Sequence, residues 1–224
     1  MQNTAVDSKH PGQFIVFEGP DGVGKSTAVS KIKQYLEKQN QEVVCVRLPG
    51  GTTVGESIRT LIKTRANMMS PEQQTVLLCL AKRQLINDVV KPALERGAYV
   101  LCDRYTDSLY AYQWAGFSDF NAEIFSCITD NLLTFEINVE PDLKFVLDCD
   151  IFESERRMRN ERSSSAIEVD VMDSADFDYK ERVRRYYRDH LRESVQGQTH
   201  YINTIEGIEN TAATIIRLME RASV

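Results

Sequence analysis

Residues 19–26 have the sequence Gly19-Pro20-Asp21-Gly22-Val23-Gly24-Lys25-Ser26, which follows the nucleotide-phosphate loop pattern G-x-x-x-x-G-K-[ST]. The apolar run 14–17 before it predicts a strand, and apolar residues recur at helical spacing after it. In a strand–loop–helix the glycines let main-chain N–H groups point at phosphate oxygens, and the helix dipole adds positive potential. We expect Lys25 to reach the β- and γ-phosphates and Ser26 to ligate Mg²⁺. The stretch predicts binding of a nucleoside triphosphate.

Short apolar runs alternate with longer helical patterns along the chain. Strands are predicted at 13–18, 42–47, 98–103, 143–149 and 199–203. Helices are predicted at 25–40, 53–66, 71–96, 106–138, 151–162, 176–195 and 208–222. Several strands are apolar throughout, which is typical of a parallel sheet covered on both faces. The alternation predicts an α/β fold: a single three-layer doubly wound domain over 14–224 with a five-stranded parallel sheet, after a flexible leader at 1–13.

Composition narrows the possible partners and the compartment. The chain has 224 residues and a net charge of −6, so it lacks the electrostatic footprint of a protein that binds duplex nucleic acid or an anionic membrane. No apolar run approaches the roughly 20 residues that cross a bilayer. The five cysteines form no C-x-x-C pair, and Cys45, Cys102 and Cys149 fall in or at the end of apolar strand-like runs. We expect buried, reduced thiols, as in a cytoplasmic protein.

Two further segments carry charge in places that suit phosphate chemistry. Asp103 and Arg104 lie at the carboxyl end of the third predicted strand, where Asp103 would hold Mg²⁺ and Arg104 would project into the crevice between two phosphates. A structural Asp–Arg pair at a strand end is the alternative. Four arginines fall within 156–162, before a run of serines at 163–165. This pattern predicts a closing lid at about 151–175, although a solvated helix face would look similar.

Four motifs resemble those of the thymidylate kinase family. They are Phe17-Glu18-Gly19-Pro20-Asp21-Gly22-Val23-Gly24-Lys25-Ser26-Thr27, Arg47-Leu48-Pro49-Gly50-Gly51-Thr52, Asp103-Arg104-Tyr105-Thr106-Asp107-Ser108 and Ala111-Tyr112-Gln113. Lys91-Pro92-Ala93-Leu94 and Pro141-Asp142-Leu143 also occur where the family has them. The resemblance covers about residues 14–223. It implies a P-loop nucleoside monophosphate kinase that uses ATP and Mg²⁺ to convert dTMP to dTDP, as a homodimer packed through helices near 71–96 and 106–138.

The resemblance also implies roles for individual residues. Asp21 would hold the 3′-hydroxyl of the acceptor, Tyr112 would pack against its sugar, and Gln113 would hydrogen-bond its base. ATP phosphates would bind Gly19, Pro20, Asp21, Gly22, Val23, Gly24, Lys25, Ser26 and Thr27, with Ser26 and Asp103 at the metal. The acceptor would contact Asp21, Arg47, Pro49, Arg59, Leu78, Lys82, Arg83, Arg104, Ser108, Tyr112 and Gln113. Arg47, Arg59 and Arg104 would grip its phosphate by charge-assisted bonds.

Because position 22 is Gly, the loop supplies no catalytic arginine, which resembles the bacterial subtype in which the lid provides one. Arg156 and Arg159 are the candidates, which makes the expected catalytic set Lys25, Arg104, Arg156 and Arg159. Phosphoryl transfer needs mainly positioning and charge neutralisation, so no general base is required.

The chain departs from the family pattern at the base pocket. Leu78 stands where the family has a stacking Phe, Lys82 (beside Arg83) where it has a base-reading Arg, and Leu109 where it has a small residue. These changes leave open a preference for dUMP or a 5-substituted dUMP such as 5-hydroxymethyl-dUMP. Leu48 replaces the Glu of R-E-P-G-G, and the lid motif D-R-[IL]-E appears as Asp170-Val171-Met172-Asp173.

Two other functions remain alternatives. A deoxynucleoside kinase would need fewer cations than Arg47, Arg59 and Arg104 supply, because its acceptor is an uncharged hydroxyl. A non-catalytic ATP-binding module would leave the lid-like arginines without a purpose.

Overall fold

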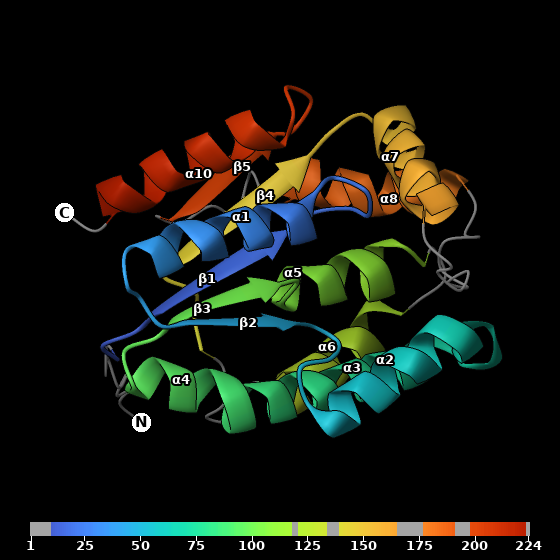
Figure 1. Ribbon diagram of the computed structural model, residues 1–224. Helices are drawn as coiled ribbons and strands as arrows, with labels where there is room; N and C mark the ends of the chain where they lie inside the picture. Colours follow the sequence, from blue (N-terminus) through green and yellow to red (C-terminus); the bar gives the residue numbers. More distant parts are fainter. Residues whose placement is uncertain (1–9, 118–120, 134–138, 165–176, 191–197, 223–224) are drawn as a thin grey trace.

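The protein is built around a parallel sheet in which all five predicted strands are present (Figure 1). The computed structural model describes residues 10–117, 121–133, 139–164, 177–190 and 198–222. The strands are β1 (Gln13–Glu18), β2 (Val43–Arg47), β3 (Tyr99–Asp103), β4 (Leu143–Asp148) and β5 (Thr199–Asn203), in the order β2-β3-β1-β4-β5. All four neighbouring pairs run parallel. The α/β fold class and the five-stranded parallel sheet are therefore confirmed.

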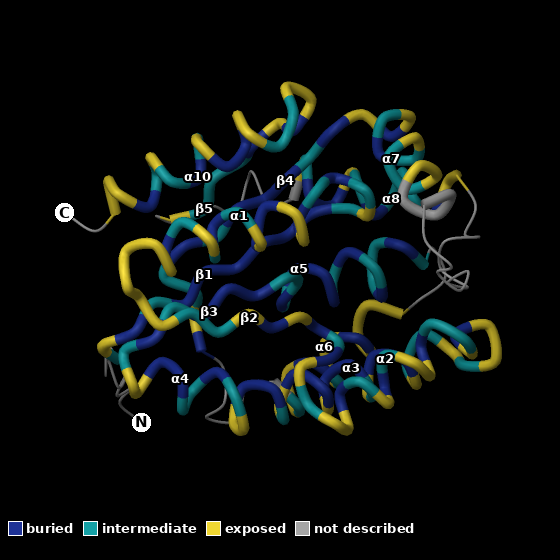
Figure 2. Tube along the Cα trace, viewed as in Figure 1, coloured by how far each residue is buried: buried dark blue, intermediate teal, exposed yellow. Residues whose placement is uncertain are grey.

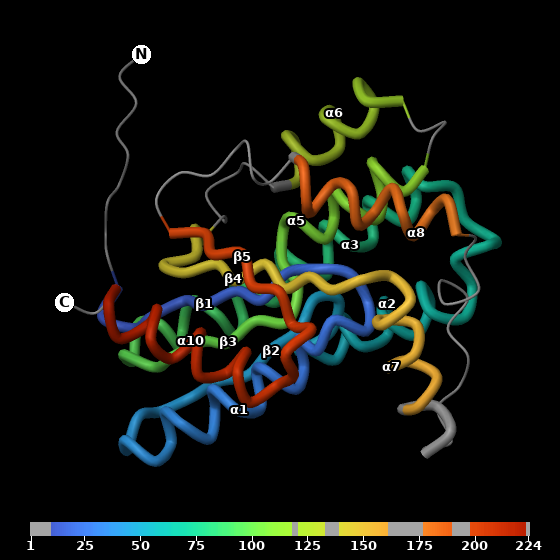
Figure 3. The backbone as a smooth tube through the Cα atoms, turned by 90° about the horizontal axis from the view of Figure 1, so that it is seen from above, coloured from blue at the N-terminus to red at the C-terminus, as the bar shows by residue number. Residues whose placement is uncertain are grey.

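Helices cover both faces of the sheet. α1 (Lys25–Lys38) and α10 (Ile208–Ala222) lie on one side, and α6 (Ala122–Leu133) and α8 (Phe177–Arg185) lie on the other (Figure 3). The second side also carries α2 (Thr53–Arg65), α3 (Pro71–Leu85), α4 (Lys91–Glu95) and the short α5 (Thr106–Leu109). α7 (Ile151–Ser164) follows β4 at its carboxyl end.

The central strand shows why these runs are apolar at every position. In β1, Phe14 and Val16 pack into the core under α2 and α3, while Ile15 and Phe17 pack into the core under α1 and α10. All four are fully buried, as the dark sheet centre in Figure 2 shows. Covering a strand on both faces removes the polar alternation expected of a half-exposed one.

The edge strand β2 differs from the expectation for its cysteine. Cys45 was expected to be buried, but it is exposed, whereas Cys102 and Cys149 are buried. β2 pairs only with β3, so its outer residues lack a neighbouring strand to cover them. All five thiols are free of disulfide bonds.

The predicted helix at 71–96 is continuous but changes its winding. Ser70 caps α3 in a capping box with Gln73, as its Ser-Pro start indicated. A π-helical segment, Ile86–Val90, then leads into α4. Pro92 lies just after it, and the wider turn accommodates a residue that lacks an N–H and crowds the preceding turn. Gly97, at φ +85°, ends the helix.

The single helix predicted over 106–138 was wrong. α5 continues as a π-helical segment, Tyr110–Ala115, which ends at a bend at Gly116, and α6 begins only at Ala122. A Cβ at Gly116 would meet the ring of Tyr179 at 2.5 Å, so the close approach of α8 requires glycine at the bend. Residues 134–138 lie outside the described part.

Both ends of the predicted domain can be compared with the structure. Gln13, assigned to the leader, is the first residue of β1, and the N–H of Gly12 donates to the carbonyl of Leu94 at 3.0 Å. Residues 1–9, most of the expected leader, lie outside the described part, as do 165–176 of the expected lid. No helix in the described ranges has the length and apolar character of a membrane span.

Candidate active site

The phosphate loop joins the carboxyl end of β1 to α1, as the motif requires. Gly19, Gly22 and Gly24 have φ values of +132°, +75° and +96°, conformations that side chains with a Cβ rarely adopt. The amino group of Lys25 donates to the carbonyl of Pro20 at 2.6 Å, inside the curve of the loop. Burial lowers the pKa of Lys25 to about 8, and the charge of Arg104 adds to this effect. A phosphate close to this amino group would raise its pKa again, because nearby negative charge favours the charged form.

Position 22 leaves no room for a side chain. A Cβ at Gly22 would lie 2.4 Å from the main-chain oxygen of Ser154 on α7. A longer residue here would have to push α7 away from the loop. With α7 in this position, the contact excludes a charged side chain at position 22.

Two oxygen ligands meet beside the loop. The hydroxyl of Ser26 donates to Oδ2 of Asp103 at 2.7 Å, which joins the first turn of α1 to the end of β3. A hydroxyl and a carboxylate suit Mg²⁺, which commonly takes one or two protein ligands and completes its shell with water and phosphates. Within the described ranges no group of three or more His, Cys, Asp or Glu gathers as an all-protein metal cage. The donor set therefore fits the predicted magnesium ion.

A cavity of about 140 Å³ opens at the carboxyl ends of β1, β2 and β3. In doubly wound sheets this edge is where ligands bind. The cavity is bounded by the phosphate loop, the segment after β2, α2, α3 and α5. Its lining residues are Asp21, Leu48, Pro49, Arg59, Ile62, Lys63, Leu78, Arg104, Tyr105, Ser108, Leu109, Tyr112 and Gln113.

Arg104 is the most heavily bonded cation of this cavity. Its Nη1 donates to the carbonyl of Gly19 and to the hydroxyl of Ser108, both at 3.1 Å. Its Nη2 donates to Asp21 and to the Tyr112 hydroxyl, and the guanidinium lies 4.5 Å from the centre of the Tyr112 ring. The main chain at Arg104 has φ +72°, an uncommon conformation for a residue with a side chain. Such strain persists where surrounding contacts determine it.

Asp21 carries a negative charge between these groups. The loss of hydration would raise its pKa, but the charges of Arg104 and Lys25 outweigh that effect and hold the pKa below its usual range. Tyr112 donates a further hydrogen bond to Asp21 at 2.7 Å. A carboxylate that is ionised at all physiological pH values can accept a hydrogen bond from a sugar hydroxyl.

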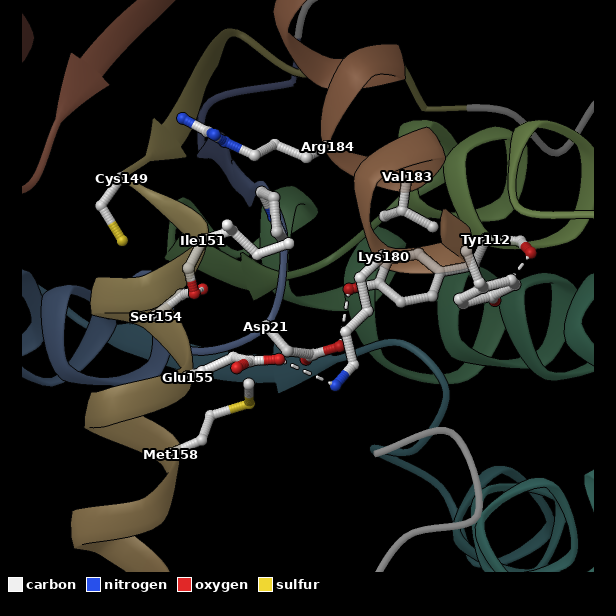
Figure 4. Close-up of a pocket in the computed structure, with 12 residues that line it drawn as sticks. Asp21, Tyr112, Cys149, Ile151, Ser154, Glu155, Met158, Lys180, Val183 and Arg184 are labelled. Atoms are coloured by element: carbon white, nitrogen blue, oxygen red, sulfur yellow. Dashed lines mark hydrogen bonds and ion pairs between the residues drawn. The ribbon is translucent and has the colours of Figure 1, made fainter. Parts of the chain in front are cut away.

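A second, smaller pocket of about 40 Å³ lies behind Asp21 and Tyr112 (Figure 4). α7 contributes Ser154, Glu155 and Met158 to its wall, and α8 contributes Lys180, Val183 and Arg184. Lys180 and Glu155 form an ion pair of 3.2 Å between the two helices (Figure 4). Asp21 and Tyr112 thus form the partition between this pocket and the larger cavity.

The structure brings together eight of the eleven predicted acceptor contacts. Arg47, Lys82 and Arg83 do not line the cavity. Arg47 forms an ion pair with Glu56 at 3.4 Å and is about half exposed, while Arg83 is exposed on α3. Lys82 is buried, with its amino group 2.7 Å from the Thr106 hydroxyl and 4.2 Å from the centre of the Tyr105 ring. The Thr106 hydroxyl and the Tyr105 ring therefore contact the ammonium group that was expected to contact the base.

The lid candidates also lie away from the cavity in this structure. Arg156 makes a two-pronged bond to Glu153 at 2.7 and 2.8 Å, and Arg159 bonds Glu155 at 3.2 Å. Both side chains are mainly exposed. Arg157, by contrast, donates to the hydroxyl and carbonyl oxygens of Thr204 and ties α7 to the end of β5.

Sequence reasoning missed several cavity residues. Ile62 and Lys63 follow Arg59 by three and four positions on α2, so helical spacing from Arg59 could have identified them. Leu48 and Leu109 had been noted only as departures from the family pattern, and both line the cavity. Tyr105 also lines it, although its hydroxyl is buried against the carbonyl of Val139.

Known proteins share this architecture and sequence. The family model described as "Thymidylate kinase" matches residues 17–215. The chain belongs to the thymidylate kinase family. A thymidylate kinase of Bifidobacterium longum subsp. infantis is 36% identical over 211 residues, which cover 91% of this chain and 84% of that protein. A thymidylate kinase of Roseiflexus castenholzii is 32% identical, with 92% of each chain covered.

A solved structure supports the same assignment. The crystal structure of thymidylate kinase from Ehrlichia chaffeensis superimposes with a TM-score of 0.67 at 26% identity, covering 93% of this chain and 98% of that one. The activity of this chain is therefore that of a thymidylate kinase, an ATP-dependent phosphotransferase that converts dTMP to dTDP. The expected fold, family and reaction are confirmed.

Buried Lys82 makes stability depend on pH. Burial lowers its pKa to about 8, below the ordinary lysine value of about 10.4. Between these values the unfolded chain binds a proton that the folded chain does not, so stability contributed by this group rises with pH. We expect Lys82→Met to be more stable than the wild type near neutral pH, by on the order of 1–3 kcal/mol, with the difference shrinking toward pH 10.

Urea unfolding at both pH values measures this difference. Lys38→Met, a change at an exposed position in the last turn of α1, is the matched control and should behave like the wild type. A stability difference for Lys82→Met that is the same near neutral pH and near pH 10 would contradict the prediction.

Proposed function

We propose that the 140 Å³ cavity holds dTMP with its phosphate toward Arg104 and Arg59, facing the triphosphate on the loop 19–27. The single observation that carries this assignment is Arg104, whose guanidinium bonds both the phosphate loop at Gly19 and the cavity wall at Tyr112. A cation in that position neutralises charge on both sides of the transferred group.

The residues present act by placing two anions and by neutralising their charge. Lys25 would contact the donor phosphates, and Arg59 and Arg104 would hold the acceptor phosphate in line. Asp21 would accept a hydrogen bond from the 3′-hydroxyl, and the Tyr112 ring would pack against the sugar. Phosphoryl transfer passes through a loose transition state, so positioning and charge account for most of the catalysis.

Mg²⁺ would be held by Ser26 and Asp103, whose oxygens already lie 2.7 Å apart. When bound there, the ion would supply positive charge that neutralises charge developing on the phosphates.

The base pocket suits a thymine. Leu48, Leu78 and Leu109 give the cavity an apolar wall, and Gln113 is buried with its Oε1 free of hydrogen bonds from the described residues. An amide oxygen without a partner can accept a hydrogen bond from a base edge. Leucine side chains can pack against the methyl group of thymine, because both surfaces are apolar. Burying the hydroxyl of a 5-hydroxymethyl group against leucines would cost free energy. The pocket therefore favours dTMP over that alternative acceptor.

Arg156 and Arg159 would supply the lid cation after α7 moves or after their side chains exchange Glu153 and Glu155 for phosphate. Their exposure supports this role, because such side chains can change partners at little cost.

A second copy of the chain would cover the outer face of α3. Val76 and Leu80 lie four positions apart on α3 and are about half exposed, and Met68 beside them is 73% exposed. A shallow groove adjoins these residues and is lined by Met68, Met69, Glu72, Gln73, Val76 and Leu77. Exposed apolar side chains that gather on one face mark interaction sites, and a two-fold dimer would bring this face of two copies together. We place the enzyme in the cytoplasm, where five free thiols stay reduced.

The acceptor site is tested by ADP production in a coupled assay. We expect ADP formation to be stimulated by dTMP. Arg59→Ala should raise the KM for dTMP on the order of 10–100-fold, because it removes charge-assisted bonds to phosphate, with little change in the KM for ATP. Arg65→Ala, an exposed arginine at the end of the same helix, is the control. ATP hydrolysis indifferent to dTMP would instead indicate an ATP-binding module.

The lid assignment is tested by Arg156→Ala and Arg159→Ala. Loss of a transition-state cation should lower kcat on the order of 10³-fold in at least one of them, with the KM for dTMP nearly unchanged. Arg185→Ala, exposed on α8, is the matched control. If both lid variants keep a kcat within a few-fold of the wild type, the catalytic arginine lies elsewhere.

The dimer is tested by Leu80→Glu. Placing a charge in the apolar face should shift the sedimentation coefficient from that of a dimer to that of a monomer. Ile205→Glu, at another exposed apolar residue in the loop after β5, should leave the dimer intact. A dimeric Leu80→Glu protein would show that the copies meet through a different surface.

A further inference from the structure

Beneath the acceptor cavity lies a buried carboxylate that the phosphate chemistry does not use. Glu18, the last residue of β1, is fully buried. Its Oε1 accepts the main-chain N–H groups of Tyr105 and Ser108 at 2.7 and 3.2 Å. Its Oε2 accepts the hydroxyls of Ser108 and Tyr187 at 2.6 and 3.0 Å. Glu18 therefore caps α5, a helix that has no side-chain cap of its own.

The same cluster reaches Arg104 through one hydroxyl. The Oγ of Ser108 donates to Glu18 and accepts the hydrogen bond from Nη1 of Arg104. The hydroxyl of Tyr187 lies 2.8 Å from this oxygen. The Ser108 hydroxyl, the Glu18 carboxylate and the Tyr187 hydroxyl therefore form one buried network. The orientation of the Ser108 hydroxyl toward Arg104 depends on Glu18 and Tyr187.

Arg104 needs such support because its main chain is in the left-handed region, at φ +72°. A residue with a Cβ leaves this region unless its contacts retain it. The turn between β3 and α5 is retained on one side by the N–H of Arg104, which donates to the carbonyl of Phe17 at 2.9 Å. On the other side it is retained by Glu18 and its hydrogen-bonding partners.

Tyr187 enters this network from a distant part of the chain. It lies in the π-helical segment Tyr186–His190, which continues α8, the helix after the expected lid. The side chain is 1% exposed, and α8 packs against the segment Tyr110–Ala115 that follows α5. π-Helical turns shift side chains out of α-helical register and occur often at functional sites.

We propose that Tyr187 is a positioning residue for Arg104, and that it ties α8 to the arginine that grips the acceptor phosphate. The inference rests on the proposed role of Arg104. Without the Tyr187 hydroxyl, Glu18 would lose one of its four hydrogen-bond donors, and its hydrogen bond from the Ser108 hydroxyl would become stronger. The hydroxyl of Ser108 would then hold Arg104 less closely in the orientation that meets the phosphate.

The test is the kinetics of Tyr187→Phe, which removes one oxygen and keeps the ring. We expect the KM for dTMP to rise on the order of 5–50-fold, as for a buried group left without a partner, while the KM for ATP changes less than about twofold. Tyr186→Phe, which removes a hydroxyl from the neighbouring residue in the same turn, should keep the wild-type KM for dTMP. A purely structural role would lower the melting temperature without this split.

A double-mutant cycle separates this inference from the proposed function. In an Arg104→Ala background, Tyr187→Phe should cause no further rise in the KM for dTMP, because the residue that it positions is gone. If Arg104→Ala leaves the KM for dTMP unchanged, the proposed role of Arg104 fails, and the present inference with it. If Arg104→Ala raises that KM but Tyr187→Phe does not, only the positioning role is overturned. Equal rises in the KM for dTMP and in the KM for ATP after Tyr187→Phe would also overturn it.

Ser108→Ala provides a second route should Tyr187→Phe not fold. It removes the hydroxyl that links Glu18 to Arg104, so it should raise the KM for dTMP with the same selectivity. A wild-type KM for dTMP in a folded Ser108→Ala protein would overturn the inference.

Discussion

A buried carboxylate with every acceptor position occupied fixes the relative positions of the parts that make this active site. Glu18 ends the central strand and has no exposure to solvent, so its charge must be met by fixed donors. Those donors come from the turn after β3 and from the helix after the expected lid. Burial and the nearby Asp107 raise the pKa of Glu18, and its hydrogen bonds oppose this shift. Because Gly19 follows directly and Ser108 links Glu18 to Arg104, the phosphate loop and Arg104 share one anchor.

Two cations at the phosphate loop and the cavity, Arg104 and Lys25, have partners within the protein before any substrate binds. Arg104 is paired with Asp21, and Lys25 is held by the carbonyl of Pro20. In the proposed complex, the two bound phosphates would replace these internal partners. This preorganisation suits phosphoryl transfer, because the protein contributes mainly fixed geometry and charge to that reaction.

The proposed base pocket would serve the family's reaction with a different set of side chains. Leu78 and Leu109 present apolar surface where the family has an aromatic ring and a small residue. Lys82 turns inward instead of reading a base, because the hydroxyl of Thr106 and the face of the Tyr105 ring receive its ammonium group. Recognition would then rest on shape, on the apolar wall and on Gln113. Pockets of this kind distinguish bases by what they exclude as much as by what they bind.

The sequence by itself determined the phosphate loop, the five strands and most helix boundaries, because these depend on local patterns. The rule that ligands meet the carboxyl edge of a parallel sheet placed Arg104 in the crevice, and the resemblance to the thymidylate kinase family implied Asp21, Arg59 and Tyr112 as its neighbours. Only the tertiary structure decided the rest. It exposed Cys45 on an edge strand, bent the chain at Gly116 against Tyr179, withdrew Lys82 from the cavity and brought Tyr187 to Glu18. The residues that meet in these contacts lie far apart in the chain or on different elements. Periodicity does not record which side chains meet across the core, and packing and buried hydrogen bonds decide it.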